Sequence, residues 1–455
     1  MRLDDEKMLQ TLFWASTLSF LPAIYFYYVG EEAIFPISSL EMHHSHSLLV
    51  QVMYGANVRH NPLFNWLIML FSGIFGWNHV LEVTRAITIF STMGSSLVLY
   101  GLAFHHTRDR HFSLFSSVVY LGLFDVAFYR GWLAYVDPLF SFFVFSSIAL
   151  LWIASRRENF GILITALVCL ELAFLSKALT AYVFYGISAL VLLRQHRKFL
   201  LGLPSILLHA LFFLFPFAWF SLLPASGQGQ RMFGEILSKL SFGEGYLAEL
   251  AGFPLELLLR LSPAALLAAW FLFRKKEKLP AEFRLAAQIA VYNFLPYWIA
   301  PQSSVRYLMP IYPFFALFMS WVLWKEGRAL TLKVVGAFLA FKLLFMLFLF
   351  PIYQHEYRGK NYLDAAREIA KETKGYPLYV TDVSASGLSV AGYLDALRWP
   401  RTPVAFPPER WDSGYVIAYD ENPSIGKTVK TYKLGGDSLY LLCRGNACMR
   451  TGASE

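Results

Sequence analysis

The chain has 455 residues, of which 56% are hydrophobic and 15% charged, and its mean hydropathy is +0.47. Soluble domains carry about 25% charged residues, so this composition excludes an ordinary soluble enzyme. Apolar runs of about 20 residues recur along the chain, which is typical of a polytopic α-helical membrane protein. We interpret the net charge of +8 as Lys and Arg held in cytoplasmic loops, and we expect no nucleic-acid partner.

The first apolar run covers residues 9–29 and is followed at once by two acids, Glu31 and Glu32. It lacks the small-residue cleavage site of a signal peptide, so we expect it to remain as a membrane span. Further spans are expected at residues 84–104, 112–129, 138–154, 160–175, 178–193, 199–222, 252–273, 284–300, 305–323 and 331–351. The sequence therefore predicts about 11 transmembrane helices in a domain that covers residues 1–351.

Basic residues are concentrated in alternate loops, which by the positive-inside rule predicts a cytoplasmic N-terminus. These loops hold Arg108 and Arg110; Arg156 and Arg157; Arg194, Arg197 and Lys198; Arg274, Lys275, Lys276 and Lys278; and Lys325 and Arg328. The apolar run at 61–76 is short for a span, and a crossing there would place every later basic loop outside. We therefore expect juxtamembrane helices in an outer loop at residues 30–83.

Residues 352–455 have a mixed, polar composition and predict a small α/β domain. We expect a helix at 361–374, strands at 378–382 and 414–420, and a hairpin formed by 427–434 and 438–443. The predicted spans place this domain on the extracytoplasmic, periplasmic side. Cys443 and Cys448 can form a disulfide in that oxidising compartment, and two free thiols are the alternative.

Charged residues at the ends of the predicted spans gather at the outer boundary of the membrane. A charge inside a bilayer costs about 2.5–3.5 kcal/mol on insertion scales, so each one calls for a role. A pore or proton relay would place some near the midplane, whereas this distribution predicts a polar cavity at the outer surface. The residues concerned are Glu31, Glu32, Arg59, His60, Arg85, Asp125, Arg130, Asp137, Glu171, Lys177, Arg231, Lys239 and Arg306.

Simpler roles remain open for several of these residues. Asp125 and Arg130 are close enough in sequence to pair with each other, as are Glu171 and Lys177. Asp137 directly precedes Pro138 and fits the role of a helix cap. Glu32 fits that of an ordinary interface residue. Histidines 43, 44, 46 and 60 could bind a metal with Glu31 or Glu32, and the alternative is surface histidines on an interfacial helix.

Five short motifs, taken in their order along the chain, resemble those of a known superfamily. They are Glu31-Glu32-Ala33, Asn61-Pro62-Leu63-Phe64-Asn65-Trp66, Asp137-Pro138-Leu139-Phe140, Ser176-Lys177-Ala178 and Arg306-Tyr307-Leu308-Met309-Pro310. Their order and predicted topology resemble C-type (GT-C) membrane glycosyltransferases, with the active site outside the membrane. Within this superfamily the chain looks most like bacterial lipid A aminoarabinose transferases and protein O-mannosyltransferases. The resemblance covers nearly the whole chain.

This resemblance implies an inverting enzyme of the cell inner membrane, which moves a sugar from a polyprenyl-phosphate donor such as an undecaprenyl phosphate sugar. The acceptor would be a lipid A-like lipid or another cell-envelope acceptor. Glu31 takes the place of the family's catalytic carboxylate, usually Asp, and Asp137 aligns with its second acid. The family's Glu-Lys-Pro-Pro becomes His60-Asn61-Pro62-Leu63, which lacks a phosphate-binding lysine and a metal-ligating acid. No cofactor is certain, and Glu31 and His60 are the candidate ligands for a divalent metal.

The chemistry of such a transfer needs a carboxylate to accept the acceptor's proton and cations to stabilise the departing phosphate. We predict catalytic roles for Glu31, Asp137 and Glu32; physical reasoning leaves Glu31 and Glu32 nearly equal, and the resemblance favours Glu31. The predicted phosphate-binding residues are Arg59, Lys177, Arg306 and Arg231, and the predicted pocket residues are His60, Asn61, Tyr307 and Arg130.

Two other functions compete with this prediction. A transporter or flippase of a lipid-linked sugar would show internal repeats and midplane polar residues, and we see neither in the sequence. A non-enzymatic membrane scaffold would leave the acids and bases from separate segments unexplained.

Overall fold

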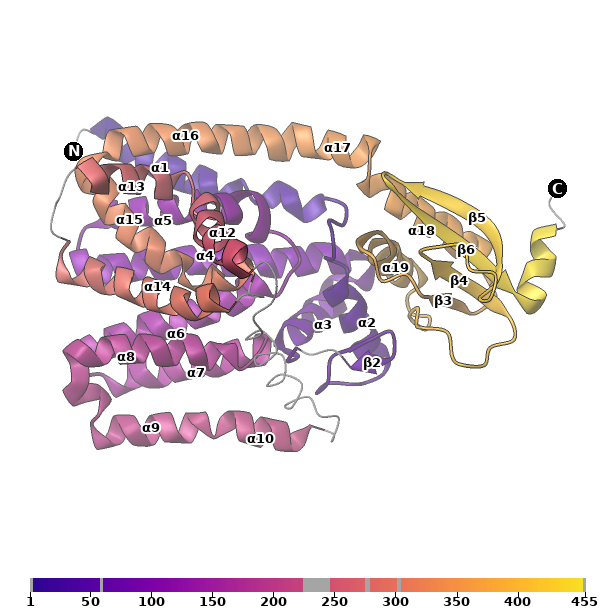
Figure 1. The fold of residues 1–455 in the computed structure, drawn as a ribbon, viewed down its shortest axis with the longest axis horizontal. Helices are drawn as coiled ribbons and strands as arrows, with labels where there is room; N and C mark the ends of the chain where they lie inside the picture. Colours follow the sequence, from indigo (N-terminus) through magenta and orange to yellow (C-terminus); the bar gives the residue numbers. More distant parts are fainter. Residues whose placement is uncertain (1–2, 58–59, 224–245, 275–278, 301–303, 453–455) are drawn as a thin grey trace.

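The computed structural model describes residues 3–57, 60–223, 246–274, 279–300 and 304–452. Long helices lie side by side in one body, and a small sheet domain stands at one end of it (Figure 1). The first half of the body contains α1 (Leu3–Leu18), η1 (Leu21–Tyr25), α4 (Val80–Thr107), α5 (Arg110–Leu121), η3 (Val126–Arg130), α6 (Asp137–Arg157), α7 (Phe160–Ser176), α8 (Thr180–Leu200), α9 (Leu203–Phe213) and α10 (Phe215–Leu222).

The second half of the body continues the same packing with shorter helices that are often broken. It contains α12 (Tyr246–Arg260), α13 (Ala264–Arg274), α14 (Ala281–Ile299), η4 (Val305–Ile311), α15 (Tyr312–Glu326), α16 (Arg328–Leu344), η5 (Phe345–Leu349) and α17 (Phe350–Glu356). A continuous apolar core joins most of these helices.

Every predicted span coincides with a helix or a pair of helices, but not all of these are long. Within the described residues, five segments are long and apolar enough to cross a membrane: Trp77–Thr107, Asp137–Arg157, Leu203–Leu222, Val305–Glu326 and Arg328–Glu356. The pair α12 and α13 adds a sixth if its two halves, bent by 104°, form one span. The fold is thus that of a helical membrane protein, and the figure of 11 spans stays a prediction.

The segment between α1 and α4 forms the predicted outer-surface helices. It contains α2 (Ile34–His44), the short strands β1 (Val52–Met53) and β2 (Ala56–Asn57), α3 (Leu63–Phe75) and η2 (Trp77–His79). Phe64 and Ile68 of α3 are buried, whereas Ile74 and Phe75 are each 65% exposed. An amphipathic helix of this length suits a membrane surface better than a crossing.

The C-terminal domain is a four-stranded sheet with two helices. Its elements are α18 (Gly359–Glu372), β3 (Leu378–Val380), α19 (Ala385–Arg398), β4 (Gly414–Ala418), β5 (Lys427–Leu434) and β6 (Asp437–Arg444). The strand order is β3-β4-β6-β5, with β3 parallel to β4 and the other pairs antiparallel. The expected hairpin forms as β5 and β6. Helix α19, which the sequence reading missed, fills the connection between β3 and β4.

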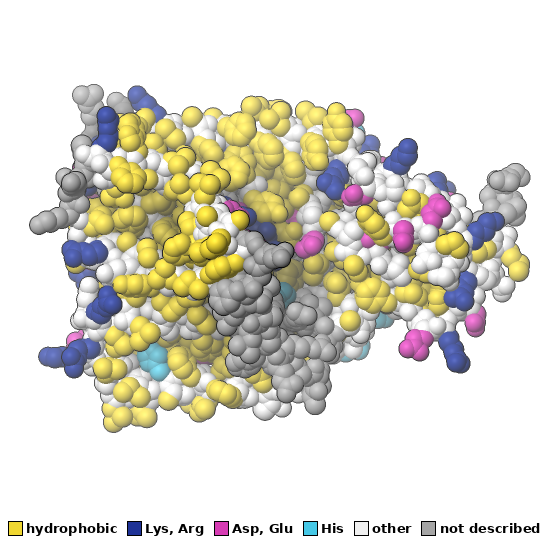
Figure 2. All heavy atoms as spheres, in the orientation of Figure 1, with side chains coloured by type: hydrophobic (Ala, Val, Ile, Leu, Met, Phe, Trp, Pro, Cys, Tyr) yellow, Lys and Arg dark blue, Asp and Glu magenta, His cyan; other side chains and the backbone are white. Residues whose placement is uncertain are grey.

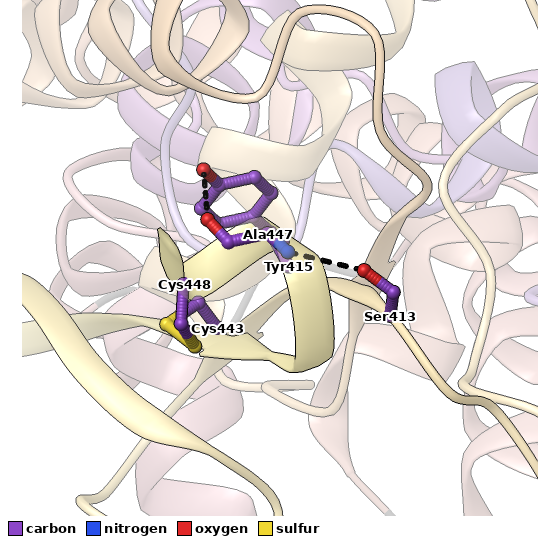
Figure 3. Close-up of a disulfide and its surroundings, with 5 residues drawn as sticks. All are labelled: Ser413, Tyr415, Cys443, Ala447 and Cys448. Atoms are coloured by element: carbon purple, nitrogen blue, oxygen red, sulfur yellow. Dashed lines mark hydrogen bonds between the residues drawn. A yellow bond between two sulfur atoms is a disulfide. The ribbon is translucent and has the colours of Figure 1, made fainter. Parts of the chain in front are cut away.

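A disulfide joins Cys443, near the end of β6, to Cys448 in the following short helix (Figure 3). Hydrogen bonds from Tyr415 Oη to the Ala447 carbonyl (3.1 Å) and from Ala447 N to Ser413 Oγ (3.1 Å) hold the enclosed turn against β4. The last turn of the described chain is therefore attached to the sheet by a covalent bond as well as by hydrogen bonds.

The C-terminal domain rests on α2 and η2 through α19. Gly392 lies against Ala33 and Tyr28, at a distance where an added Cβ would approach them to 3.0 and 3.1 Å. The rings of Tyr28 and Tyr393 are 4.7 Å apart, and those of Trp77 and Trp399 are 5.0 Å apart. The domain is thereby packed directly on the chain turn that carries Glu31 and Glu32.

Charge is distributed unevenly over the molecule. Figure 2 shows many Lys and Arg side chains at the end of the helical body that is opposite the C-terminal domain, with a mostly hydrophobic flank between the two. The short connections between helices that meet at that end include those carrying Arg108 and Arg157, and the chain begins there as well (Figure 1).

Candidate active site

Asp137 is at the centre of a cluster of cations at the end of the helical body nearest the C-terminal domain. It is the first residue of α6 and is 6% exposed. Its carboxylate accepts a hydrogen bond from Lys177 Nζ, at the end of α7, and its Oδ2 lies 3.8 Å from Arg130 Nη1. Side chains from η3, α6 and the end of α7 thus meet at one carboxylate.

Arg306 and Tyr307, at the start of η4, complete the same cluster. Arg306 Nη2 donates a hydrogen bond to Tyr307 Oη (3.1 Å), and Lys177 Nζ lies 4.7 Å from the centre of the Tyr307 ring. The guanidinium of Arg306 interacts electrostatically with Asp137 and also with Glu31. The structure therefore brings together the predicted residues Glu31, Arg130, Asp137, Lys177, Arg306 and Tyr307.

Several guanidinium N–H groups in this cluster lack a hydrogen-bond acceptor among the described residues. Nε and Nη1 of Arg130 and Nε of Arg306 are buried and make no hydrogen bond within the described part of the chain. Buried polar groups are nearly always satisfied in native proteins, so these N–H groups require an acceptor from elsewhere. A phosphate has the charge and the oxygen atoms that such donors bind best.

Glu31 lies at the edge of the cluster with its side chain exposed. Its backbone N–H donates to Tyr135 Oη (3.2 Å), and burial raises the pKa of the Tyr135 hydroxyl, which keeps that group protonated. Gly30 has φ +59°, and a Cβ there would come within 3.3 Å of the same Tyr135 oxygen. This turn directs Glu31 toward solvent beside Arg306, where a substrate hydroxyl can reach its carboxylate.

Glu32, in contrast, is fully buried and has partners at both of its oxygens. Arg85 donates to Oε1 from Nε (2.9 Å) and to Oε2 from Nη2 (2.5 Å). The backbone N–H groups of Ala134 (2.6 Å) and Val29 (2.7 Å) donate to the same two oxygens. These contacts give Glu32 a structural role, and a catalytic role for it stays a prediction. Its carboxylate is enclosed in a structural ion pair and has no free position for a substrate.

Arg85 extends this structural role to the chain before the acids. It donates to the carbonyl oxygens of Ala23 (3.1 Å), Phe26 and Tyr27 (2.7 Å). The pair Arg85 and Glu32 therefore fixes both η1 and the segment before Asp137, between which Glu31 is held. The sequence showed Arg85 at the membrane boundary but gave no indication of its partner.

Asn61 also has a positioning role. It is buried, donates from Nδ2 to the Phe174 carbonyl (2.8 Å) and from its backbone N to the Lys177 carbonyl (3.2 Å), and accepts from Trp219 Nε1 (3.2 Å). These bonds anchor the end of α7, and the place of Asn61 in a substrate pocket stays a prediction. His60 stacks on Phe35, with ring centres 6.0 Å apart.

The neighbouring ion pairs that the sequence left open do not form. Asp125 instead accepts from Arg260 (2.7 Å) and from Tyr312 Oη (2.9 Å). Glu171 accepts from Tyr182 Oη rather than from Lys177. Arg130 and Lys177 therefore both pair with Asp137.

Two predicted phosphate ligands, Arg59 and Arg231, lie outside the described residues. The predicted metal ligands Glu31 and His60 belong to no suitable ligand set: within the described ranges, no three His, Cys, Asp or Glu side chains are grouped to hold a metal ion.

No protein-family model and no curated protein matches this sequence. Solved structures do match the fold, among them two of ArnT. One is ArnT from Cupriavidus metallidurans bound to undecaprenyl phosphate, with a TM-score of 0.71, 13% identity, and coverage of 96% of this chain and 97% of the other. The chain has the ArnT fold. ArnT in its apo state matches with a TM-score of 0.68 at 13% identity, over 95% of this chain and 97% of the other.

The likeness to ArnT extends over both parts of the molecule, since nearly the whole of each chain is covered. The fold that the motif order suggested is therefore confirmed. At 13% identity, the prediction of this fold rested on a few short motifs and on the spacing of apolar runs. Sequence comparison alone does not detect this kind of similarity.

Proposed function

We propose that this protein is an inverting glycosyltransferase that moves a sugar from a polyprenyl-phosphate donor to a lipid A-like lipid or another cell-envelope acceptor. The observation that carries the proposal is the set of unsatisfied buried guanidinium donors beside Asp137 and Lys177, next to the exposed carboxylate of Glu31. The ArnT fold supports it, as does the undecaprenyl phosphate bound in one ArnT structure.

In the proposed reaction, an acceptor hydroxyl oxygen forms a bond to the anomeric carbon while the bond from that carbon to the phosphate oxygen breaks. The hydroxyl proton passes to Glu31, and the electron pair leaves with the polyprenyl phosphate. Lys177, Arg130 and Arg306 stabilise the charge that develops on the phosphate in a site of low dielectric. Asp137 holds Lys177 in place for this task.

The charge pattern supports an outer location for this reaction. Basic side chains gather at the end of the body opposite the site, as they do on the cytoplasmic side of membrane proteins (Figure 2). We accordingly propose an inner-membrane protein with a cytoplasmic N-terminus, an active site at the outer face and a periplasmic C-terminal domain.

Glu31→Gln tests the proposal. Purified protein in nanodiscs, given a polyprenyl-phosphate sugar and a lipid A acceptor, should release polyprenyl phosphate, and the variant should lose at least about a hundredfold in rate. Glu356→Gln, at an exposed acid of α17 that pairs with His355, is the matched control. Normal turnover by the Glu31 variant would overturn the assignment of the base.

The alternative of a transporter or flippase makes a different prediction in the same system. It would move the labelled lipid-linked sugar across proteoliposome membranes without any release of polyprenyl phosphate. Release of polyprenyl phosphate that requires Glu31 would support the transferase and exclude the transporter.

A further inference from the structure

An apolar groove opens along the exposed face of α4, away from the Asp137 cluster. Its volume is about 620 Å³, and apolar side chains from η1, α3 and α4 line it: Ile24, Tyr25, Phe71, Phe75, Ala86 and Phe90. Tyr25 is 81% exposed, and Phe75 and Phe90 are each 65% exposed. So large an aromatic surface, left open on a helix that is long and apolar enough to cross a membrane, suits contact with a lipid chain.

The two faces of α4 separate this groove from the catalytic cluster. Arg85, Thr88 and Thr92 face inward, where they bind Glu32, the Tyr135 carbonyl and the Gly131 carbonyl. Glu82, Ala86 and Phe90 line the groove, and at 100° per residue their stripe lies about 130° around the helix from that of the inward residues. The groove is therefore a separate site and not an extension of the Asp137 cluster.

One end of the groove is polar and carries negative charge. His79 and Glu82 lie there with their side chains 3.6 Å apart, 54% and 33% exposed. No Lys or Arg lines the groove among the described residues. A polyprenyl phosphate or another purely anionic headgroup would meet a carboxylate without a compensating cation, whereas a protonated amine would find a partner in Glu82.

Glu82 lies in the first turn of α4, and Phe90 lies eight residues further along, which is about 12 Å for a helix. A lipid whose amine binds Glu82 would therefore lay an acyl chain along the apolar stripe toward Phe90. The geometry points to a binding site for a phospholipid with a primary-amine headgroup, of the phosphatidylethanolamine class, in the groove between η1, α3 and α4. This inference is independent of the proposed glycosyl transfer.

Such a lipid would contact the segment that positions Glu31. Ile24 and Tyr25 of the groove wall lie between Ala23 and Phe26, whose carbonyl oxygens are held by Arg85 on the other side. Glu82 also interacts electrostatically with Tyr28 and Tyr393, at the junction with the C-terminal domain. An occupied groove would therefore stabilise the turn and the domain junction together.

Native mass spectrometry of the full-length protein in detergent tests this site. Titration with phosphatidylethanolamine, phosphatidylglycerol or undecaprenyl phosphate should show roughly tenfold tighter binding of the amine lipid than of phosphatidylglycerol. Undecaprenyl phosphate should not displace bound phosphatidylethanolamine. Glu82→Gln should remove the headgroup preference, and Ala86→Trp should block the groove and abolish binding.

Leu97→Trp is the matched control, because Leu97 is 61% exposed on the same helix but outside the groove. It should bind the amine lipid like the unaltered protein. Equal binding of both phospholipids by the unaltered protein, or displacement by undecaprenyl phosphate, would overturn the inference. If Ala86→Trp fails to elute as a folded monodisperse protein, the isosteric Glu82→Gln and the competition arm still decide the question.

Discussion

Glu31 and Glu32 are adjacent, chemically identical and placed in opposite environments. One is exposed beside Arg306, and the other is buried in an ion pair with Arg85. The sequence predicted two acids at a membrane boundary, but it could not separate them, because their difference depends on partners 53 and 102 residues away. Family resemblance selected Glu31, and the contacts of Glu32 now give a physical reason for that choice.

Removing Arg85 should be among the most damaging single changes in the chain. Arg85→Met would leave the Glu32 carboxylate buried without a cation, which typically costs about 3–5 kcal/mol. We expect a marked fall in the unfolding midpoint of the purified protein in detergent. Combining it with Glu32→Gln should restore part of the loss, because the uncompensated charge is gone.

The single variant Glu31→Gln is the control for this series, since its side chain is exposed and its backbone N–H makes the contact to Tyr135. It should unfold like the unaltered protein. An Arg85→Met protein with unchanged stability would show that the ion pair contributes little.

Asp395 in α19 makes the C-terminal domain sensitive to pH. Burial raises the pKa of its carboxyl from 3.8 to about 8, and Oδ2 has no hydrogen-bond partner among the described residues, while Oδ1 accepts from Val404 N (2.7 Å). The folded state thus keeps a proton that the unfolded state has lost between pH 4 and pH 8. Stability contributed by this group is present at low pH and falls as the pH rises through that window.

Asp395→Asn should flatten this dependence, because the amide is neutral at every pH in the window. Hydrogen exchange of β3 and α19 in the full-length protein, measured from pH 5 to pH 8.5 and corrected for intrinsic rates, gives the local opening free energy. The unaltered protein should open more readily at the upper end, and the variant should not. The same slope in both proteins would exclude Asp395 as the cause.

At the scale of elements, apolar runs predicted where helices lie but not how they bend or pair. Runs of about 20 residues became helices because lipid leaves the backbone no other way to satisfy its hydrogen bonds. The 104° bend between α12 and α13 has no comparable signal in composition. Helix α19 was missed because its first turn, Ala385-Ser386-Gly387, is typical of a loop, although Ser384 supplies a side-chain cap to Gly387 N.

The contact of α19 with the acid-bearing turn can be tested at Gly392. Gly392→Leu would force its side chain against Ala33 and Tyr28, which already lie where a Cβ would be 3.0 and 3.1 Å from them. We expect the C-terminal domain to lose its packing on α2 and the transfer reaction to slow, with the sheet itself still folded. Increased hydrogen exchange confined to α2 and α19 would register the separation.

Gly436→Leu provides the comparison, because nothing lies within 4 Å of the Cβ it would add. That variant should keep both the exchange pattern and the activity. If both variants behave alike, the approach of Gly392 to Tyr28 does not hold the junction.

For the whole molecule, the sequence predicted the order of helices and the helical segment between α1 and α4, while the position of the site stays a prediction. It could not predict which charges pair, because Asp137 and Lys177 are 40 residues apart and Asp125 and Arg260 are 135 apart. Such partners are set by helix packing, which periodicity does not encode. The local pairs suggested by sequence proximity were for that reason the wrong ones.

The proposed orientation of the protein in the membrane can be tested by cysteine labelling. In a Cys169→Ala background, Glu409→Cys in the C-terminal domain should react with a membrane-impermeant maleimide on intact spheroplasts. Glu158→Cys, in the exposed connection between α6 and α7, should react only after permeabilisation. The reverse pattern would place the C-terminal domain in the cytoplasm and contradict the proposed site of reaction.

The position of Arg85 also bears on the order of synthesis. An arginine in a membrane-entering helix is costly until it is neutralised. Glu32 and the carbonyl groups of Ala23, Phe26 and Tyr27 all precede Arg85 in the chain. When α4 leaves the ribosome, its partners have therefore already been made, and the helix can enter the bilayer before the later helices exist. Asp137, by contrast, must wait for Lys177 and Arg306, so the cluster around Asp137 is completed only late in biogenesis.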